Sequence, residues 1–233
     1  MVKESSKTNK TENIYIVVPA KNEGLRVAKV VQSILAEGYS NVIVVDDGSE
    51  DDTSEHAKSA GAKVIRHLVN LGAGAATQTG IEYALTKGAD TIVTMDGDSQ
   101  HFASDIPKLV AHLNNQNLDL VIGSRFLDAV NQIPVDRIIV NKLANIFSGI
   151  ITGLFVTDSQ SGMKAFHSNL AAKMHFTFDG YEFCTEILKI THQEKARFGE
   201  VPIQVKYAEE LQGKGQSWKN IGKMVFRLLK YFY

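Results

Sequence analysis

Residues 91–101 read TIVTMDGDSQH, an apolar, β-branched run that ends in two carboxylates one residue apart, Asp96 and Asp98. Apolar and β-branched residues favour a buried strand. Two carboxylates at the end of such a strand repel each other and resist desolvation, and a divalent cation offsets both effects. Mg²⁺ and Mn²⁺ prefer oxygen ligands and commonly share them with substrate phosphates. The stretch therefore predicts a metal site at a strand end, with a solvated turn as the alternative.

The composition is that of a globular protein that can bury a sizeable core without disulfides. The chain has 233 residues, of which 44% are hydrophobic, and its formal net charge is −1. This length suits one α/β domain with an appended piece, and the near-neutral charge disfavours nucleic acid as the main partner. Cys184 is the single cysteine, so it cannot form an internal disulfide and fits a reducing compartment. We expect it to be a small buried residue rather than a nucleophile.

Strand and helix patterns alternate along the chain. Apolar runs predict strands at 14–19, 41–46, 62–67, 91–95 and 118–123, and helical spacing predicts helices at 23–37, 53–59, 75–85 and 106–114. This order predicts an α/β fold with a largely parallel, doubly wound sheet, in which ligands lie beyond the carboxyl ends of the strands. Polar clusters fall at those ends, at 19–23, 46–49, 70–72, 96–98 and 123–125.

These clusters resemble a known family. The motifs VVPAKNE (17–23), VVDDGSEDDT (44–53), NLGAGAA (70–76) and the Asp-x-Asp pair resemble, in this order, the signature of family-two glycosyltransferases. GSRF (123–126) and DSQSGMK (158–164) are similar to the branch of dolichol-phosphate mannose synthases and polyprenyl-phosphate hexosyltransferases. The resemblance implies a GT-A nucleotide-diphospho-sugar transferase fold, a mostly parallel twisted sheet flanked by helices, in a catalytic domain over 14–216.

The resemblance also implies a donor site and a metal. Residues from four motifs would bind the nucleotide-sugar: Pro19, Ala20, Asn22, Glu23, Asp47, Asn70, Gly72 and Asp96. Asp47 would lie near the base or ribose, because a carboxylate accepts hydrogen bonds from hydroxyl and N–H groups. Asp98 and Gln100 would bind Mg²⁺ or Mn²⁺, with Asp96 beside the metal or at the ribose. A plain turn at 47–49, followed by Thr53 as a helix cap, is the alternative for that motif.

On the acceptor side, the resemblance places Arg125 and Arg137 at the phosphate of the acceptor, with Ser161 nearby. The forked guanidinium donates two parallel hydrogen bonds to phosphate oxygens, although a surface salt bridge is the alternative for Arg137. A phosphate monoester has a second pKa of about 6, so the acceptor can attack as a dianion without a strong base. Asp158 is therefore expected to orient groups rather than abstract a proton, and in-line displacement would invert the anomeric centre.

Three segments concern the membrane and the chain ends. Residues 137–156 are apolar but interrupted by polar side chains, which predicts an amphipathic helix pair at the interface rather than a spanning helix. Residues 217–233 combine an apolar stripe with Lys and Arg, which predicts a basic amphipathic helix on an anionic membrane, or a helix packed on the domain. Residues 1–13 are polar and predict a disordered leader. The expected location is the cytoplasmic face of a membrane, as a peripheral protein, or the cytoplasm.

The resemblance thus implies an inverting, metal-dependent transfer of a hexose from a nucleotide-sugar, of the GDP-mannose or UDP-glucose type, to a polyprenyl or dolichyl monophosphate. Four alternatives stay open. They are a family-two transferase with a non-lipid acceptor, a Rossmann NAD-dependent oxidoreductase suggested by the Gly-Ala-Gly at 72–74, an Asp-x-Asp phosphatase, and a non-catalytic binding module. Neither the nucleotide and sugar nor the oligomeric state follows from the sequence.

Overall fold

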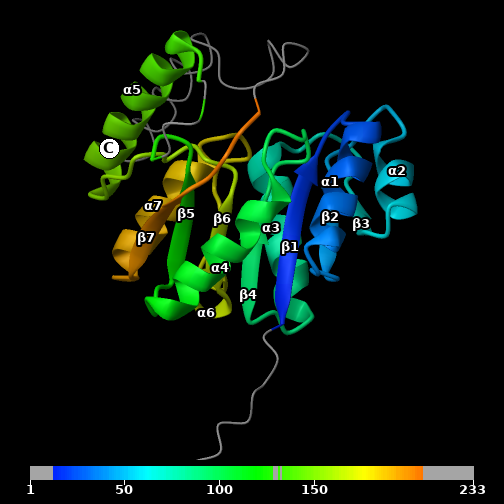
Figure 1. The fold of residues 1–233 in the computed structure, drawn as a ribbon, viewed down its shortest axis with the longest axis horizontal. Coiled ribbons are helices and arrows are strands. Elements are labelled where there is room, and N and C mark those ends of the chain that lie inside the picture. The colour runs from blue at the N-terminus through cyan, green and yellow to red at the C-terminus, as the bar shows by residue number, and fades with distance from the viewer. Residues whose placement is uncertain (1–12, 128–130, 132, 207–233) are drawn as a thin grey trace, which may run out of the picture.

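The computed structural model describes residues 13–127, 131 and 133–206. The expected helix at 217–233 and all but the last residue of the expected leader at 1–13 lie outside these residues. The described chain builds a seven-stranded sheet in the order β3-β2-β1-β4-β6-β5-β7, seen edge to edge in Figure 1. Its strands are β1 (Ile14–Ala20), β2 (Val42–Asp46), β3 (Lys63–Arg66), β4 (Thr91–Thr94), β5 (Leu120–Ser124), β6 (Lys164–His167) and β7 (Phe198–Pro202).

Every neighbouring pair in the sheet is parallel except those that include β6, which runs antiparallel to both β4 and β5. The inner parallel strands β1, β2 and β4 consist mainly of apolar and β-branched residues because helices cover both of their faces, whereas the edge strands β3 and β7 also carry charged residues. In β1, Ile16 and Val18 belong to the core on one face, and Val17 belongs to the core on the other. Full burial of one such side chain stabilises the fold by about 1.5–3 kcal/mol. The predicted mostly parallel α/β fold is confirmed.

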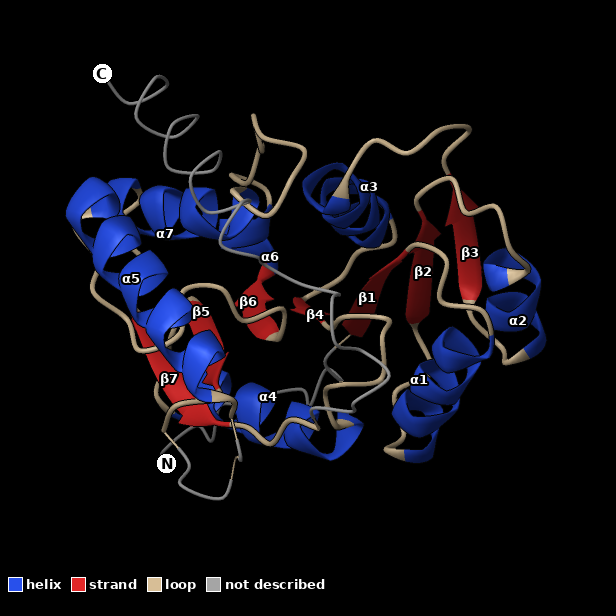
Figure 2. Cartoon of the chain, turned by 90° about the horizontal axis from the view of Figure 1, so that it is seen from above, coloured by secondary structure: helices blue, strands red, loops and turns tan. Residues whose placement is uncertain are grey.

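Helices form a layer on each face of the sheet. Figure 2 shows α3, α6 and α7 over one face and α1 and α4 over the other, with α5 beside α7. The helices are α1 (Leu25–Ala36), α2 (Thr53–Ser59), α3 (Ala73–Thr86), α4 (Ile106–Asn115), α5 (Val135–Thr152), α6 (Ser168–Ala171) and α7 (Phe183–Gln193), with a 3-10 turn, η1 (Ala103–Asp105), before α4. This packing leaves the carboxyl ends of the parallel strands at one edge of the sheet, where the polar loops gather.

The segment at 137–156 differs from its expectation. Residues 137–152 belong to one helix, α5, rather than a helix pair, because this span has no proline and its one glycine, Gly149, does not adopt a positive φ. The helix ends at Gly153, whose left-handed φ of 76° is the conformation that glycine adopts without strain. Among the residues that the structure describes, no helix combines the length and the apolar character needed to cross a bilayer.

Candidate active site

The Asp-x-Asp loop lies on the end of β1 and against the loop that precedes β6. A side chain at Gly97 would meet the carbonyl oxygen of Pro19 and Cβ of Ala20, both 3.1 Å from the position of an added Cβ. A side chain at Gly162 would collide with the carboxylate of Asp96. These two glycines let three segments that are remote in sequence meet at one carboxylate pair.

Asp98 and Gln100 form a compact pair. Asp98 accepts hydrogen bonds from the backbone N–H of Gln100 at 2.9 Å and from its Nε2 at 2.6 Å. Burial, and then the charge of Asp96, raise the pKa of Asp98. Burial also disfavours the ionised form of Asp96, but the hydrogen bond and charge of His101 lower its pKa overall. The pKa values of the two neighbouring carboxylates are thus shifted in opposite directions, because only Asp96 lies beside His101 while each carboxylate opposes the ionisation of the other.

The residues at this point fit a hard divalent cation. Two carboxylates and one amide converge, and a half-turn of the Gln100 amide would bring its oxygen beside the carboxylate of Asp98. Within the described ranges no group of three His, Cys, Asp or Glu side chains could hold a metal by itself. A cation here would therefore take its remaining ligands from a bound diphosphate and water, which is common for Mg²⁺.

His101 is a site residue that the sequence analysis missed. Its Nε2 lies 3.4 Å from Oδ2 of Asp96, and its buried Nδ1 has no hydrogen-bond partner among the residues described. The backbone of His101 is held by an antiparallel bridge to Val205, in the chain after β7. The available signal was its position, directly after the metal motif in the stretch at 91–101.

The carboxylate of Asp47 is hydrogen-bonded to the backbone of the loop after β3. Its Oδ1 accepts the backbone N–H of Leu71 at 2.8 Å, and its Oδ2 accepts that of Gly72 at 2.7 Å. His67 Nδ1 lies 2.8 Å from the same Oδ1. Asp47 therefore fixes the loop at 70–72 beside the end of β2, whereas Asn70 in that loop is exposed. Its predicted contact with the base or ribose remains a prediction.

The loops after β1 and β2 are joined by hydrogen bonds. The backbone N–H of Asn22 donates to Ser49 Oγ at 2.9 Å, and the Asn22 side-chain oxygen accepts from the N–H of Glu50 at 2.9 Å. Thr53 Oγ1 accepts the N–H groups of Glu23 at 2.9 Å and Gly24 at 3.0 Å. Helix α2 begins without a side-chain cap bond, so the alternative role of Thr53 as a helix cap is wrong.

Arg125 and Asp158 form the centre of the expected acceptor side. Asp158 is fully buried and accepts three bonds from Arg125: from the backbone N–H at 3.0 Å, from Nε at 2.7 Å and from Nη2 at 2.7 Å. Asn141 in α5 connects the two predicted arginines, because its Oδ1 lies 3.5 Å from Arg125 Nη2 and its Nδ2 donates to the Arg137 carbonyl at 2.8 Å. Ser161 is fully buried, and its hydroxyl bonds to the backbone of Met163 within the same loop.

Two further residues, which the sequence analysis also missed, support the loop at 157–161. Glu200 in β7 accepts the N–H of Thr157 at 2.9 and 3.0 Å and its hydroxyl at 2.8 Å. Asn145 in α5 accepts the N–H and the hydroxyl of Ser159 at 2.8 and 2.7 Å. Because these partners are 14 to 43 residues apart, no local pattern indicates them.

Behind this loop lie Lys164 and Cys184. Lys164 is almost fully buried, and its Nζ donates to the carbonyl of Ser161 and lies 3.8 Å from Cys184 Sγ. Burial raises the pKa of the Cys184 thiol, although the charge of Lys164 opposes the rise. Cys184 is thus the small buried residue that was expected, and its protonated thiol is a poor nucleophile.

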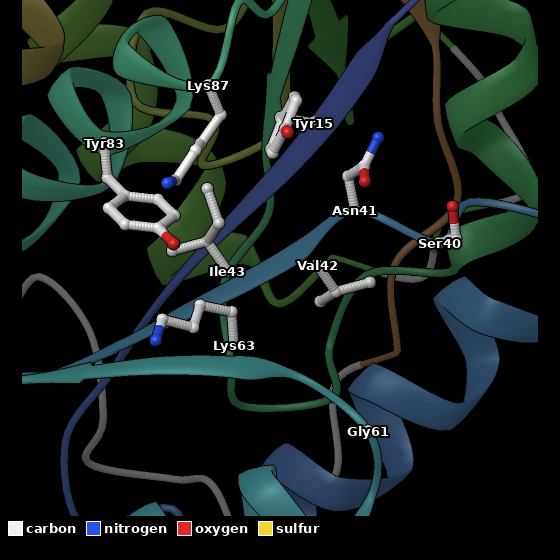
Figure 3. A pocket seen from close by; sticks show the side chains of 9 residues that line it. All are labelled: Tyr15, Ser40, Asn41, Val42, Ile43, Gly61, Lys63, Tyr83 and Lys87. Carbon is white, nitrogen blue, oxygen red and sulfur yellow. The ribbon is translucent and has the colours of Figure 1, made fainter.

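A separate pocket lies at the opposite edge of the sheet. Its volume is about 270 Å³, and its lining residues, shown in Figure 3, include residues at the amino ends of β1, β2 and β3. Tyr15, Asn41, Lys63, Tyr83 and Lys87 are among the residues that line it. None of the predicted site residues lines this pocket, so the convergence of polar loops, rather than this cavity, defines the candidate site.

Comparisons with known proteins agree with this architecture. Residues 15–166 match the family model described as Glycosyl transferase family 2. A UDP-N-acetylglucosamine–dolichyl-phosphate N-acetylglucosaminyltransferase of Methanococcus voltae is 34% identical, and the alignment covers 93% of this chain and 94% of that protein. A polyprenol monophosphomannose synthase of Mycolicibacterium smegmatis is 25% identical over 95% of this chain and 87% of its own length.

Solved structures carry the same fold. Glucosyl-3-phosphoglycerate synthase from Mycobacterium tuberculosis, crystallised with Mn²⁺, UDP and glucosyl-3-phosphoglycerate, superposes with a TM-score of 0.72 at 21% identity. This superposition covers 94% of this chain and 78% of that one. Family membership makes the oxidoreductase and phosphatase alternatives untenable. The strand-end loops, the family match and the shared GT-A fold together identify the chain as a glycosyltransferase of family 2.

Proposed function

We propose that the protein transfers a hexosyl group, with inversion, from a nucleotide-diphospho-sugar to a polyprenyl or dolichyl monophosphate. The observation that carries this proposal is that acidic and basic side chains lie near each other at the carboxyl ends of the parallel strands. Asp96 and Asp98 follow β4, whereas Arg125, held by Asp158, follows β5. The relatives from Methanococcus voltae and Mycolicibacterium smegmatis, named for dolichyl-phosphate and polyprenol substrates, support the acceptor class.

The donor would lie over the ends of β1, β2 and β4. Asp98 and Gln100 would hold Mg²⁺ or Mn²⁺ at the diphosphate, and that cation would neutralise the charge that develops on the departing nucleoside diphosphate. Pro19, Ala20, Asn22, Glu23 and Asp47, with Asn70 and Gly72, would border the nucleotide. The interlocked loops after β1 and β2 support this role, because their bonds are made before any ligand arrives and little ordering cost remains on binding.

The acceptor phosphate would bind at Arg125, with Arg137 on the neighbouring helix. A buried Asp158 that accepts three bonds from Arg125 is suited to orienting the guanidinium rather than to abstracting a proton. This agrees with an acceptor that is already mostly a dianion at neutral pH, since its second pKa is about 6. Attack in line with the leaving diphosphate would invert the anomeric centre.

A lipid acceptor requires a surface for its chain, and α5 supplies an apolar one. Five exposed residues repeat along the helix at helical spacing: Val135, Ile139, Leu143, Ile146 and Ile150. Apolar surface of this kind marks contact with a partner or a membrane. The stripe runs along the helix that also carries Arg137 and Asn141, so an isoprenoid chain could leave the phosphate site directly into lipid. We propose peripheral contact with the cytoplasmic face of a membrane.

A donor and acceptor screen tests the proposal. GDP-mannose, UDP-glucose and UDP-N-acetylglucosamine, each with Mg²⁺ or Mn²⁺, would be combined with a short-chain polyprenyl phosphate, and the released nucleoside diphosphate measured. We expect one donor to support transfer to the polyprenyl phosphate and EDTA to abolish it. Transfer to a soluble phosphorylated acceptor such as phosphoglycerate, with none to the polyprenyl phosphate, would refute the lipid acceptor and favour the non-lipid alternative.

A further inference from the structure

Residues 203–206, here called the connecting segment, follow β7 and join two loops of the candidate site. All four of their backbone N–H groups donate hydrogen bonds to these loops or to residues beside them. Ile203 donates to the carbonyl of Ser124 at 3.0 Å, and Lys206 donates to the carbonyl of Gln100 at 2.9 Å. One end of the segment is thus bonded directly before the proposed acceptor arginine, and the other end is bonded to a proposed metal ligand.

Apolar packing fixes the connecting segment against the sheet. The side chain of Ile203 is fully buried in the core. A Cβ at Gly123 in β5 would lie 2.7 Å from Cγ2 of Ile203, so the glycine is what allows the isoleucine to pack there. Val205 packs against the same core, and its backbone forms the bridge to His101. The segment is therefore a fixed part of the fold, and its position determines where its backbone N–H groups lie.

The carboxylate of Asp105 holds the connecting segment on the side of the metal motif. Asp105 is almost fully buried, and its Oδ2 accepts the N–H of Gln204 at 2.8 Å. Its Oδ1 accepts from Nζ of Lys108 at 2.7 Å, and the Lys108 side chain is largely exposed. Loss of the carboxylate would leave the N–H of Gln204 without its acceptor. Asp105 thus fixes the backbone two positions before Lys206, which binds the Gln100 carbonyl.

The side chain of Asn131 holds the same segment on the acceptor side. Its Oδ1 accepts the N–H of Val205 at 2.9 Å. Its Nδ2 donates to the carbonyl of Ile203 at 2.8 Å and to that of Arg125 at 2.9 Å. An amide group supplies one acceptor and two donors, which matches these three partners. One side chain therefore joins the backbone of Arg125 to the connecting segment.

We infer that Asp105 and Asn131 are positioning residues, which set the backbone of Gln100 and that of Arg125 relative to each other through the connecting segment. This inference rests on the proposed function, because it takes Gln100 as a metal ligand and Arg125 as the acceptor arginine. Transfer requires the acceptor phosphate to meet a donor that the metal holds, and a misplacement of about 1 Å can lower such a rate about 100-fold. Neither residue belongs to a motif that the sequence analysis singled out.

The inference predicts effects that cross from one side of the site to the other. If each residue supported only its nearest loop, Asp105 would influence metal binding alone and Asn131 would influence the acceptor alone. Both residues hold one segment that is bonded to both loops. We therefore expect loss of either side chain to affect metal binding and acceptor binding together.

Metal binding to an Asn131 variant is the first test, and it needs no acceptor. Titration calorimetry of Mn²⁺ with UDP and with GDP would compare the full wild-type chain, Asn131→Ala and Asn115→Ala, a control at an exposed position in α4. We expect Asn131→Ala to weaken Mn²⁺ binding about 3- to 10-fold, less than the roughly 10- to 100-fold typical of residues that bond a metal ligand directly. Asn115→Ala should stay within about twofold of wild type. An Mn²⁺ affinity that Asn131→Ala leaves unchanged would overturn the inference.

Hydrogen exchange on the ligand-free protein gives a second readout of the same variant. Exchange of the amides of residues 203–206 should accelerate in Asn131→Ala, because the N–H of Val205 loses its acceptor. The amide of Lys206, which the variant does not touch, is the decisive one. Wild-type exchange at Lys206 would show that the segment does not carry the change to Gln100, and would overturn the inference.

Acceptor kinetics of Asp105 variants test the opposite direction. Asp105→Ala should raise the KM for a short-chain polyprenyl phosphate about 3- to 10-fold, the effect of one hydrogen bond. Asp105→Asn keeps an oxygen that can accept the N–H of Gln204, so it should restore the KM to within about twofold. Lys108→Ala removes only the exposed ion-pair partner and should leave the KM unchanged. Equal losses in Asp105→Asn and Lys108→Ala would assign the effect to the ion pair and overturn the inference.

The remaining outcomes separate this inference from the proposed function. Where Asp105→Ala does not fold, Asn131→Ala carries the test, and its Mn²⁺ and exchange measurements decide the inference even if the lipid acceptor is wrong. Lower melting temperatures with wild-type Mn²⁺ affinity and acceptor KM would show that both residues only stabilise the fold, which overturns the inference and leaves the proposed function intact. A wild-type protein that binds Mn²⁺ with neither nucleotide would refute the proposed function and the inference with it.

Discussion

The proposed donor and acceptor sides of the site are built differently. On the donor side, Asp47 and Asp98 accept backbone N–H groups from the loops that follow β3 and β4. On the acceptor side, the central contacts are made between side chains of α5, β7, the loop before β6 and Arg125, which follows β5. The donor side is thus fixed by bonds within the loops at the strand ends, and the acceptor side by side chains that α5 and β7 also supply. Substitutions on each side should therefore separate donor binding from acceptor transfer.

The largest expected effect belongs to the metal motif. Asp98→Ala should abolish turnover and the metal-dependent binding of the nucleotide, because the pair Asp98 and Gln100 loses its charged member. Its melting temperature should stay at the wild-type value or rise slightly, since one of two repelling, partly buried carboxylates is removed. Transfer assays, titration calorimetry with Mn²⁺ and thermal melts measure the three effects. Glu55→Ala, a substitution at an exposed position in α2, serves as the control. Near wild-type transfer by Asp98→Ala would show that Asp98 is not a metal ligand.

Arg125→Lys should affect only the acceptor side. Lysine keeps the charge but loses the fork that binds Asp158 and, in the proposed arrangement, the acceptor phosphate, so transfer should fall about 10- to 100-fold, as for one or two charged hydrogen bonds. Donor affinity should change less than about threefold, because no donor contact depends on the fork. Initial rates at saturating donor and calorimetry with the nucleotide-sugar distinguish the two. A loss of donor affinity equal to the loss of transfer would move Arg125 to the nucleotide.

Part of the fold and of the site could be predicted from the sequence, and part could not. The strands, the order of the polar loops and the carboxylate pair all follow from patterns within ten or so residues, so they could be predicted. Asn145 and Glu200 could not, because their partners Ser159 and Thr157 lie 14 and 43 residues away in the sequence. His101 follows the carboxylate pair directly, but no local pattern shows that its ring lies beside Asp96. Strands β6 and β7 were also not predicted: the antiparallel direction of β6 depends on its neighbours in the sheet, which no local periodicity reports.

The apolar face of α5 gives a third test, with an effect confined to lipid. Ile146→Glu with Ile150→Glu places two charges on the exposed stripe, and should reduce flotation with anionic vesicles and transfer to long-chain acceptors about tenfold, since each residue then opposes entry into lipid. Transfer to a short-chain acceptor should stay close to wild type. Asn115→Asp with Gln116→Glu adds similar charge at the exposed end of α4 and is the matched control. Equal losses with both acceptors would assign the stripe to packing or to a protein partner.

The smallest expected effect concerns Glu200, which contacts neither substrate in the proposed arrangement. Its carboxylate accepts both the N–H and the hydroxyl of Thr157, and it also lies 3.3 Å from the N–H of Asp158. Glu200→Gln keeps the shape of the side chain but replaces one of the two accepting oxygens with an amide group, which cannot accept a hydrogen bond. The loss of one hydrogen bond at a surface position costs about 1 kcal/mol. The loop that presents Asp158 to Arg125 would loosen, so the acceptor KM should rise about 2- to 5-fold, while the donor KM and the Mn²⁺ requirement stay unchanged. Steady-state kinetics with each substrate varied in turn measures both constants. A change confined to the donor KM would mean that β7 supports the nucleotide side. The division between a donor side built from strand-end loops and an acceptor side supported by α5 and β7 would then be wrong.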